Sequence, residues 1–145
     1  MISVQLRNRH LVVKSTEGTL RQILDGLEEG MGVIGGKLKE HAAANHVAFG
    51  PGAARKQNPD GSYRFFSRTG KAQGSIEEMK VERTARSVRG GIMGGSTQAN
   101  YLVHLEFGTR HAPAFPCFKP AGDAIRPKMS EIMRKALAKH VRGKR

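Results

Sequence analysis

The sequence predicts an α+β fold, in which a long N-terminal helix and a C-terminal helix pack against an antiparallel sheet of three to four strands. Two observations carry this prediction. Apolar residues recur at helical spacing over residues 16–45 and again after Pro120. Between Ser75 and Phe107 they alternate with polar residues instead, which is typical of strands. The chain has 145 residues, about the size of one domain, so we expect a single domain over residues 1–145.

A first short strand is predicted near the start of the chain. Ile2, Val4 and Leu6 alternate with polar residues, which is the two-residue period of a strand. Residues 11–13 either extend this strand or form a second short piece after a turn.

The N-terminal helix is predicted over residues 16–45. Its apolar residues form one helical face: Leu20, Ile23, Leu24, Leu27, Met31, Ile34, Leu38 and Ala42. Glycine costs a helix about 0.5–1 kcal/mol per residue relative to alanine, and this stretch holds five: Gly26, Gly30, Gly32, Gly35 and Gly36. Two explanations stay open. Either the helix breaks near Gly35 and Gly36, or small residues let a neighbouring element approach closely.

Residues 45–75 are rich in glycine, proline, asparagine, serine and basic residues. Residues 58–61 read Asn-Pro-Asp-Gly, a strong turn signal. A structureless loop of this length is uncommon in a compact domain unless it has a function. The segment is either a flexible loop or, on the sharper interpretation, a projecting basic loop or β-hairpin that forms an arm.

Three further strands are predicted over residues 76–83, 87–93 and 100–107, as an antiparallel meander with the last strand at its centre. Glu82 and Glu106 could approach each other across these strands, but we expect these carboxylates to form ion pairs with Arg83 or Arg89 instead.

The C-terminal helix is predicted to open at Pro120 and Ala121. Pro127 either kinks its first turns or marks its true start, because proline is tolerated at the first helical position. Residues 142–145, Arg-Gly-Lys-Arg, are predicted to be a basic tail.

The net charge of +13 is unevenly distributed. Residues 45–75 carry five basic and one acidic side chain, and residues 110–145 carry ten and two, whereas residues 76–109 are balanced. A basic surface that only aids solubility would not leave the centre neutral. The distribution therefore favours a localised contact with an acidic partner such as nucleic acid, an anionic membrane surface or an acidic protein face.

Several classes of protein are excluded by what the sequence lacks. One cysteine, Cys117, forms neither an internal disulfide framework nor a four-cysteine zinc site, and fits a reducing compartment. No apolar run approaches the ~20 residues that span a bilayer, and the first residues carry no signal-peptide pattern. His41 and His46 are five residues apart, a poor spacing for one helix face. With no phosphate-binding loop and no pattern typical of a catalytic site, we expect no enzyme activity, no cofactor and no metal.

The second half carries a recognisable arrangement of short motifs. Thr-Gly at 69–70 and Ser-Ile at 75–76 precede Glu-Phe-Gly-Thr at 106–109, and Pro-Cys-Phe-Lys-Pro-Ala at 116–121 leads into a basic amphipathic helix. This arrangement resembles the tail-component family of tailed bacteriophages, whose members are called neck, head–tail joining or tail-completion proteins. The resemblance covers about residues 16–141. The sequence departs from the family where Cys117 and Phe118 stand in place of Phe-Leu, and where residues 47–68 exceed the usual short link.

The resemblance implies a virion structural protein of the head–tail junction, assembled in the host cytoplasm. Its implied form is a cyclic homo-oligomer, six-fold or twelve-fold, which lines or flanks the DNA channel. The implied partners are the connector or head-closure protein on one side and the tail tube or tail terminator protein on the other. Two alternatives stay open: a tail terminator protein, and a free nucleic-acid-binding protein without sequence specificity.

The residues expected at contacts lie in the arm and in the loop before the last helix. Phe107 and Phe118 are also expected to pin this loop to the core. Contacts between subunits are expected at Arg55, Lys56, Tyr63, Phe65, Phe66, Glu106, Phe107, Gly108, Thr109, Pro116 and Phe118. Nonspecific contacts with DNA phosphates are expected at Arg64, Arg68, Lys71, Arg110 and Lys119.

Overall fold

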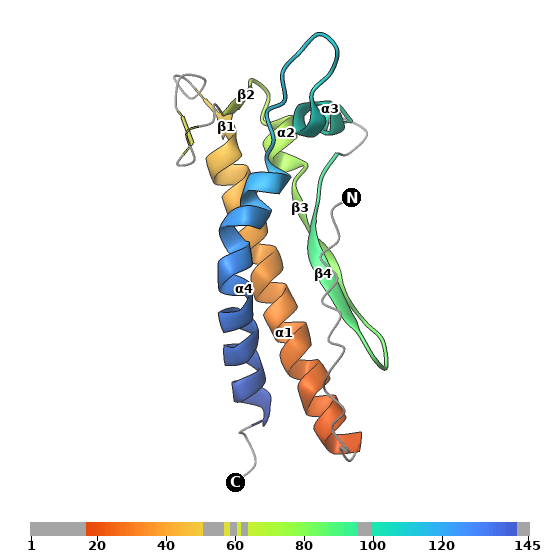
Figure 1. The fold of residues 1–145 in the computed structure, drawn as a ribbon. Coiled ribbons are helices and arrows are strands. Elements are labelled where there is room, and N and C mark those ends of the chain that lie inside the picture. Colours follow the sequence, from red (N-terminus) through yellow and green to blue (C-terminus); the bar gives the residue numbers. More distant parts are fainter. Residues whose placement is uncertain (1–16, 51–56, 59–60, 62–63, 96–99, 142–145) are drawn as a thin grey trace.

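Two long helices lie side by side, and a β-hairpin packs against the first of them (Figure 1). The structure, a computed structural model, describes residues 17–50, 57–58, 61, 64–95 and 100–141. The helices are α1 (Glu17–His41) and α4 (Phe118–Val141), and the hairpin is formed by β3 (Glu77–Arg83) and β4 (Val88–Met93). The short elements gather at one end of this frame: η1 (Ala42–His46), β1 (Val47–Phe49), β2 (Phe65–Ser67), α2 (Lys71–Gly74) and α3 (Leu102–Phe107).

Helix α1 runs without a break through its five glycines, so the second of the two explanations is confirmed. A Cβ atom at Gly26 would lie 3.0 Å from the Cα atom of Leu137 in α4. One at Gly35 would lie 3.1 Å from the carbonyl oxygen of Gly91 in β4. The glycines therefore let a helix and a strand approach α1 from two sides. A five-residue π-helix, η1, then carries the chain to His46, close to the predicted end.

The hairpin confirms the first two strands of the predicted meander. β3 and β4 pair antiparallel, from Glu77 opposite Met93 to Arg83 opposite Val88. In the described part of the chain this sheet has two strands rather than three to four. The strand expected over residues 2–6 lies outside the described residues.

The predicted central strand over residues 100–107 is wrong, because Leu102–Phe107 forms helix α3. Leu102 and Glu106 are buried, whereas Val103 and Phe107 are exposed. Both pairs are spaced by four residues, so burial follows the helical period. Over six residues an apolar pattern fits either period, and tertiary packing decides between them.

The segment 45–75 is only partly described. Gly61 donates its backbone N–H to the carbonyl oxygen of Asn58 at 2.9 Å, which confirms the predicted turn. β1 pairs with β2 in parallel, so a crossover connects them rather than a tight hairpin turn. Ser67 and Ala72 are buried, so β2 and α2 belong to the body and not to a projecting arm. Residues 51–56, 59–60 and 62–63 lie outside the described residues.

Helix α4 begins at Phe118, two residues before the predicted start, and Pro127 lies inside it rather than at its first position. Its inward residues Ala121, Ile125 and Met133 join a core that α1, β4 and the short elements also form. The largest fully buried side chains among the described residues are Met31, Ile34, His46, Val47, Ile76, Leu102 and Cys117.

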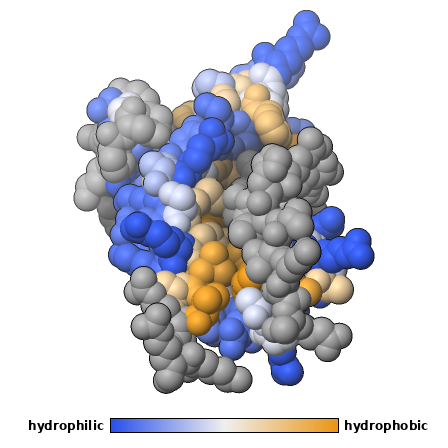
Figure 2. Space-filling model, turned by 60° about the horizontal axis from the view of Figure 1, so that its bottom comes forward, coloured by the Kyte–Doolittle hydropathy of each residue, from blue (hydrophilic) through white to orange (hydrophobic). Residues whose placement is uncertain are grey.

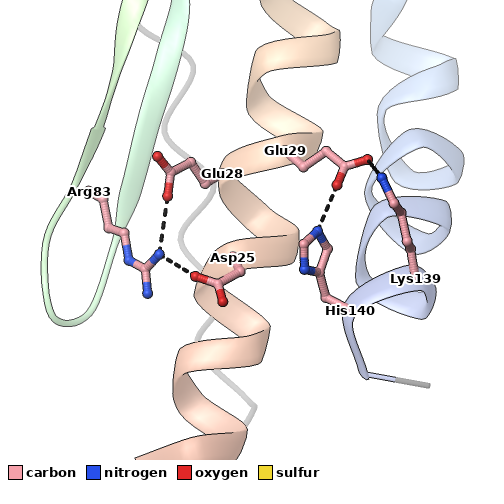
Figure 3. Close-up of polar contacts among 6 residues, drawn as sticks. All are labelled: Asp25, Glu28, Glu29, Arg83, Lys139 and His140. Carbon is pink, nitrogen blue, oxygen red and sulfur yellow. Dashed lines mark hydrogen bonds and ion pairs between the residues drawn. The ribbon is translucent and has the colours of Figure 1, made fainter. Parts of the chain in front are cut away.

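Ion pairs fasten α1 to its neighbours on both sides (Figure 3). The Arg83 guanidinium in β3 binds the carboxylates of Asp25 and Glu28, the latter at 3.1 Å. On the other side, Glu29 accepts hydrogen bonds from Lys139 Nζ at 2.8 Å and from His140 Nε2 at 2.6 Å, both in α4. The expected pairing of Glu106 with Arg83 or Arg89 is therefore wrong, since Arg83 is held by α1 and Glu106 faces α4.

Candidate subunit-contact surface

The Glu106 carboxylate caps the N-terminus of α4. Its Oε2 accepts hydrogen bonds from the backbone N–H groups of Cys117 at 2.7 Å and Phe118 at 3.0 Å, and its Oε1 accepts one from Lys119 at 2.8 Å. The first N–H groups of a helix have no partner within the helix, and the helix dipole favours a negative charge there. Glu106 is only 8% exposed, so these bonds replace the water that its charge would otherwise need. The two motifs of the second half are thus parts of one structure.

The loop between α3 and α4 is folded by local hydrogen bonds. Thr109 Oγ1 accepts from the backbone N–H groups of His111 and Ala112, and the Thr109 N–H donates to the Ala112 carbonyl at 2.9 Å. Gly108 has φ of 74°, and a Cβ atom there would lie 3.0 Å from the backbone nitrogen of Ala114. Position 108 therefore requires glycine for both its backbone conformation and its space.

Aromatic rings join this loop to the body. Phe65 in β2 lies 6.2 Å from the ring of Tyr101 and 6.4 Å from that of Phe115, measured between ring centroids. Phe115 also donates its N–H to the Leu105 carbonyl at 2.7 Å. Phe118 is half-buried against the core, as expected for a residue that pins the loop.

Helix α3 turns an apolar face to solvent. Phe107 is 78% exposed and Val103 58% exposed, and residues four apart lie on the same side of a helix. The expectation that Phe107 pins the loop to the core is therefore wrong, because Leu102 and Glu106 take the inward positions of α3. Exposed apolar side chains that adjoin one another mark contact surfaces in many proteins.

Exposed apolar residues also occur at the far end of the molecule. Figure 2 turns that end forward and shows apolar surface between hydrophilic side chains. Leu20 near the start of α1 and Val141 at the end of α4 are 43% and 46% exposed. Leu20 therefore offers a control for the α3 face, since it is apolar and exposed but distant from it (Figure 1).

Cys117 is part of the structural junction. It is 1% exposed, and burial, followed by the charge of Glu106, raises the pKa of its thiol to about 12. At neutral pH it stays a neutral thiol, which is a poor nucleophile.

Most of the other expected contact residues in the described part of the chain lie close together. Glu106, Gly108, Thr109, Pro116 and Phe118 lie together at the junction of α3 and α4, and Phe65 packs beside it. Phe66 is half-buried in β2, whereas Arg55, Lys56 and Tyr63 lie outside the described residues.

The residues expected to contact phosphates are not equally available. Arg64 is half-buried and donates from Nε to Asn58 Oδ1 at 3.1 Å. The remaining four side chains are exposed: Arg68, Lys71, Arg110 and Lys119.

Val103 is the residue of this surface that the sequence interpretation missed. On the predicted strand over residues 100–107 it shares a face with Phe107. A spacing of four residues fits one face of a strand as well as one face of a helix, so the local pattern does not reveal this exposed helical side.

The described residues contain neither a membrane-spanning helix nor a group of side chains suited to a metal ion. No helix among them is long and apolar enough to cross a membrane. In the same part of the chain, no three or more His, Cys, Asp or Glu side chains are grouped so that they could hold a metal ion.

Comparison with protein-family models, with curated proteins and with solved structures finds no match for this chain.

Proposed function

We propose that this chain is a virion structural protein of the head–tail junction of a tailed bacteriophage, of the neck or tail-completion kind. Copies of it form a closed ring, six-fold or twelve-fold, between the connector and the tail tube. The observation that carries the proposal is the contact between the two motifs on which the resemblance rests. The Glu-Phe-Gly-Thr glutamate, Glu106, holds the backbone of the second motif at Cys117, Phe118 and Lys119.

The exposed side of the same unit supports a role in assembly. Val103 and Phe107 lie on the exposed side of α3. The buried side of α3 is bound to α4 through Glu106, so the two apolar side chains project from a rigid helix. In a ring each subunit presents one surface to the next and receives another, which requires a contact between unlike surfaces. The apolar face of α3 is the surface we assign to one side of that contact. Full burial of one such side chain contributes about 1.5–3 kcal/mol.

The test compares the symmetry of three proteins. The wild type, the double variant Val103→Ser with Phe107→Ser, and the control Leu20→Ser are examined by sedimentation velocity and negative-stain microscopy. We expect closed rings from the wild type and the control, and monomers from the α3 variant. Loss of the two contacts weakens each association step by at least roughly tenfold.

A wild-type protein that forms no ring would count against this function. So would a two-fold dimer, because such a dimer uses identical surfaces and closes without a ring. A double variant that still assembles fully would contradict only the assignment of α3 to the contact. Thermal melting of all three proteins checks that the substitutions leave the fold intact.

A further inference from the structure

The outer side of α4 is a basic surface along its whole length. Helix α1 covers the other side, where Ala121, Ile125, Met133 and Ala136 are buried, and α4 stands at the edge of the molecule (Figure 1). The helix carries six basic residues and two acidic ones. The basic residues are all exposed: Lys119, Arg126, Lys128, Arg134, Lys135 and Lys139.

These basic residues form two rows. Lys119 and Arg126 are seven residues apart and therefore lie on one flank of the helix. Arg134 follows eight residues later and lies about 80° further round, toward the outermost side of the helix. Lys128 and Lys135 are also seven apart. Two residues correspond to about 200° around a helix, so Lys128 stands opposite Arg126. The two rows are thus separated by the width of the helix.

Carboxylates neutralise these basic residues only in part, and Lys139 is bound to Glu29 of α1 at 2.8 Å. Asp123 is shared by Lys119 at 3.8 Å and Arg126 at 3.7 Å, and Glu131 pairs with Lys135 at 2.6 Å. The side chains in these pairs are all more than half exposed, and such pairs are weak enough for a phosphate to replace the carboxylate. Lys128 and Arg134 make no ion pair within the described part of the chain.

The dimensions of this surface fit a DNA duplex. A helix with its side chains is about 10–12 Å across, and the major groove is about 12 Å wide. A helix that lies along the groove with a basic row on each flank faces both phosphate backbones. The strip between the rows includes Pro127 and Ala138, together with Ser130, Arg134 and the carboxylates of Asp123 and Glu131. The two basic rows are therefore the part of this face that we assign to phosphate contact.

An anionic membrane fits the same surface less well. A helix that lies on a membrane inserts large apolar side chains between the lipids. Among the large apolar side chains exposed in the described residues, Val141 is the one that α4 contributes, and it lies at the very end of the helix.

We infer that the outer face of α4, with its two basic rows, binds the phosphates of duplex DNA. The choice of DNA as the anion rests on the proposed function, in which the ring lines or flanks a DNA channel. DNA would then contact a helix rather than the loops. Of the residues expected from the sequence to contact phosphates, Lys119 belongs to this helix.

The experiment measures how binding of a short random-sequence duplex depends on salt, by fluorescence anisotropy between about 50 and 200 mM salt. The test variant is Lys128→Ala with Arg134→Ala. The control, Lys80→Ala with Arg86→Ala, removes two equally exposed positive charges from β3 and the turn that follows it. Each lost phosphate contact lowers the slope of log K against log salt by about 0.9. We expect the slope to fall by about 1.8 in the test variant and to stay unchanged in the control.

Three results would overturn the inference. The first is a control variant that reduces the slope as much as the test variant does, which would mean that only total charge matters. The second is a protein that binds phosphatidylserine vesicles but not the duplex. The third is a wild type that forms rings and binds no duplex, in which case the proposed function stands and this inference fails. Rings that fail to form while the α4 variant still loses DNA binding would count against the proposed function alone. Unchanged melting temperatures confirm that both variants are folded.

Discussion

A buried carboxylate is costly unless donors surround it, and Glu106 is surrounded by the backbone of α4. Three N–H groups point at its two oxygens, and the positive end of the helix dipole lies beside it. The neighbouring Cys117 thiol is disfavoured as an anion by the same charge and by burial. At the scale of residues, the buried carboxylate of Glu106 therefore links α3 to the start of α4.

The substitution Glu106→Gln tests this fastening. An amide lacks the charge and presents one acceptor oxygen in place of two, so hydrogen bonds to a charged group are lost. Such bonds contribute about 1.5–3 kcal/mol, and we expect the free energy of unfolding to fall by about that amount. Urea titration measures it. The control Glu131→Gln removes an exposed partner of Lys135 and should change stability by about 0.5 kcal/mol or less. Equal losses in both variants would contradict a capping role for Glu106.

At the scale of elements, the glycines of α1 lower its helix propensity but allow α4 and β4 to pack closely against it. Gly26 faces Leu137 and Ala136 of α4, and Gly35 faces the backbone of β4. Gly32 faces open space, with nothing within 4 Å of the position that a Cβ atom would take. The same residue type thus serves packing at some positions of one helix and not at others.

This difference predicts opposite effects of one substitution. Gly32→Ala should raise the free energy of unfolding by about 0.5–1 kcal/mol, because alanine is the better helix former and the space is free. Gly26→Ala gains the same propensity but presses on the Leu137 backbone, which cannot yield as a side-chain tip can. Overpacking costs about 1–3 kcal/mol, so Gly26→Ala should destabilise the protein. Stabilisation of both variants in urea titrations would show that α4 moves away freely.

The element the sequence pattern misassigned is α3. Residues 101–107 satisfy a two-residue period through Tyr101, Val103 and Leu105, and a four-residue period through Leu102 and Glu106. The second period prevails because a helix brings the Glu106 carboxylate to the start of α4. That contact joins residues 11 to 13 positions apart, and no local pattern contains it.

At the scale of the whole molecule, α1 is the element to which the others are attached. The hairpin and α4 both pack on it, and an ion-pair group fastens each of them (Figure 3). Glu29 serves the α4 side. Hydrogen bonds from Lys139 and then from His140 hold the pKa of Glu29 below its ordinary value of 4.5. A carboxyl group with a lowered pKa favours the folded state while it is ionised.

The pH dependence of this link has a definite sign. The stabilisation by Glu29 is present above its unfolded pKa and disappears as the pH falls through the lower pKa of the folded state. The wild type should therefore be more stable than Glu29→Gln at neutral pH, and the two should converge below about pH 4.5. Urea midpoints measured from neutral to acid pH follow this. A gap between wild type and Glu29→Gln that persists in acid would contradict the link.

The sequence by itself determined the two long helices, the β3–β4 hairpin and the turn at residues 58–61. These features follow from local periods and turn residues, which are physical properties of short segments. Only the tertiary structure decided that residues 102–107 are a helix, that Glu106 caps α4, that the glycines of α1 are contact points and that Phe107 faces outward. Each of these depends on segments distant in sequence, and the free energy of their packing outweighs the preference of any one segment.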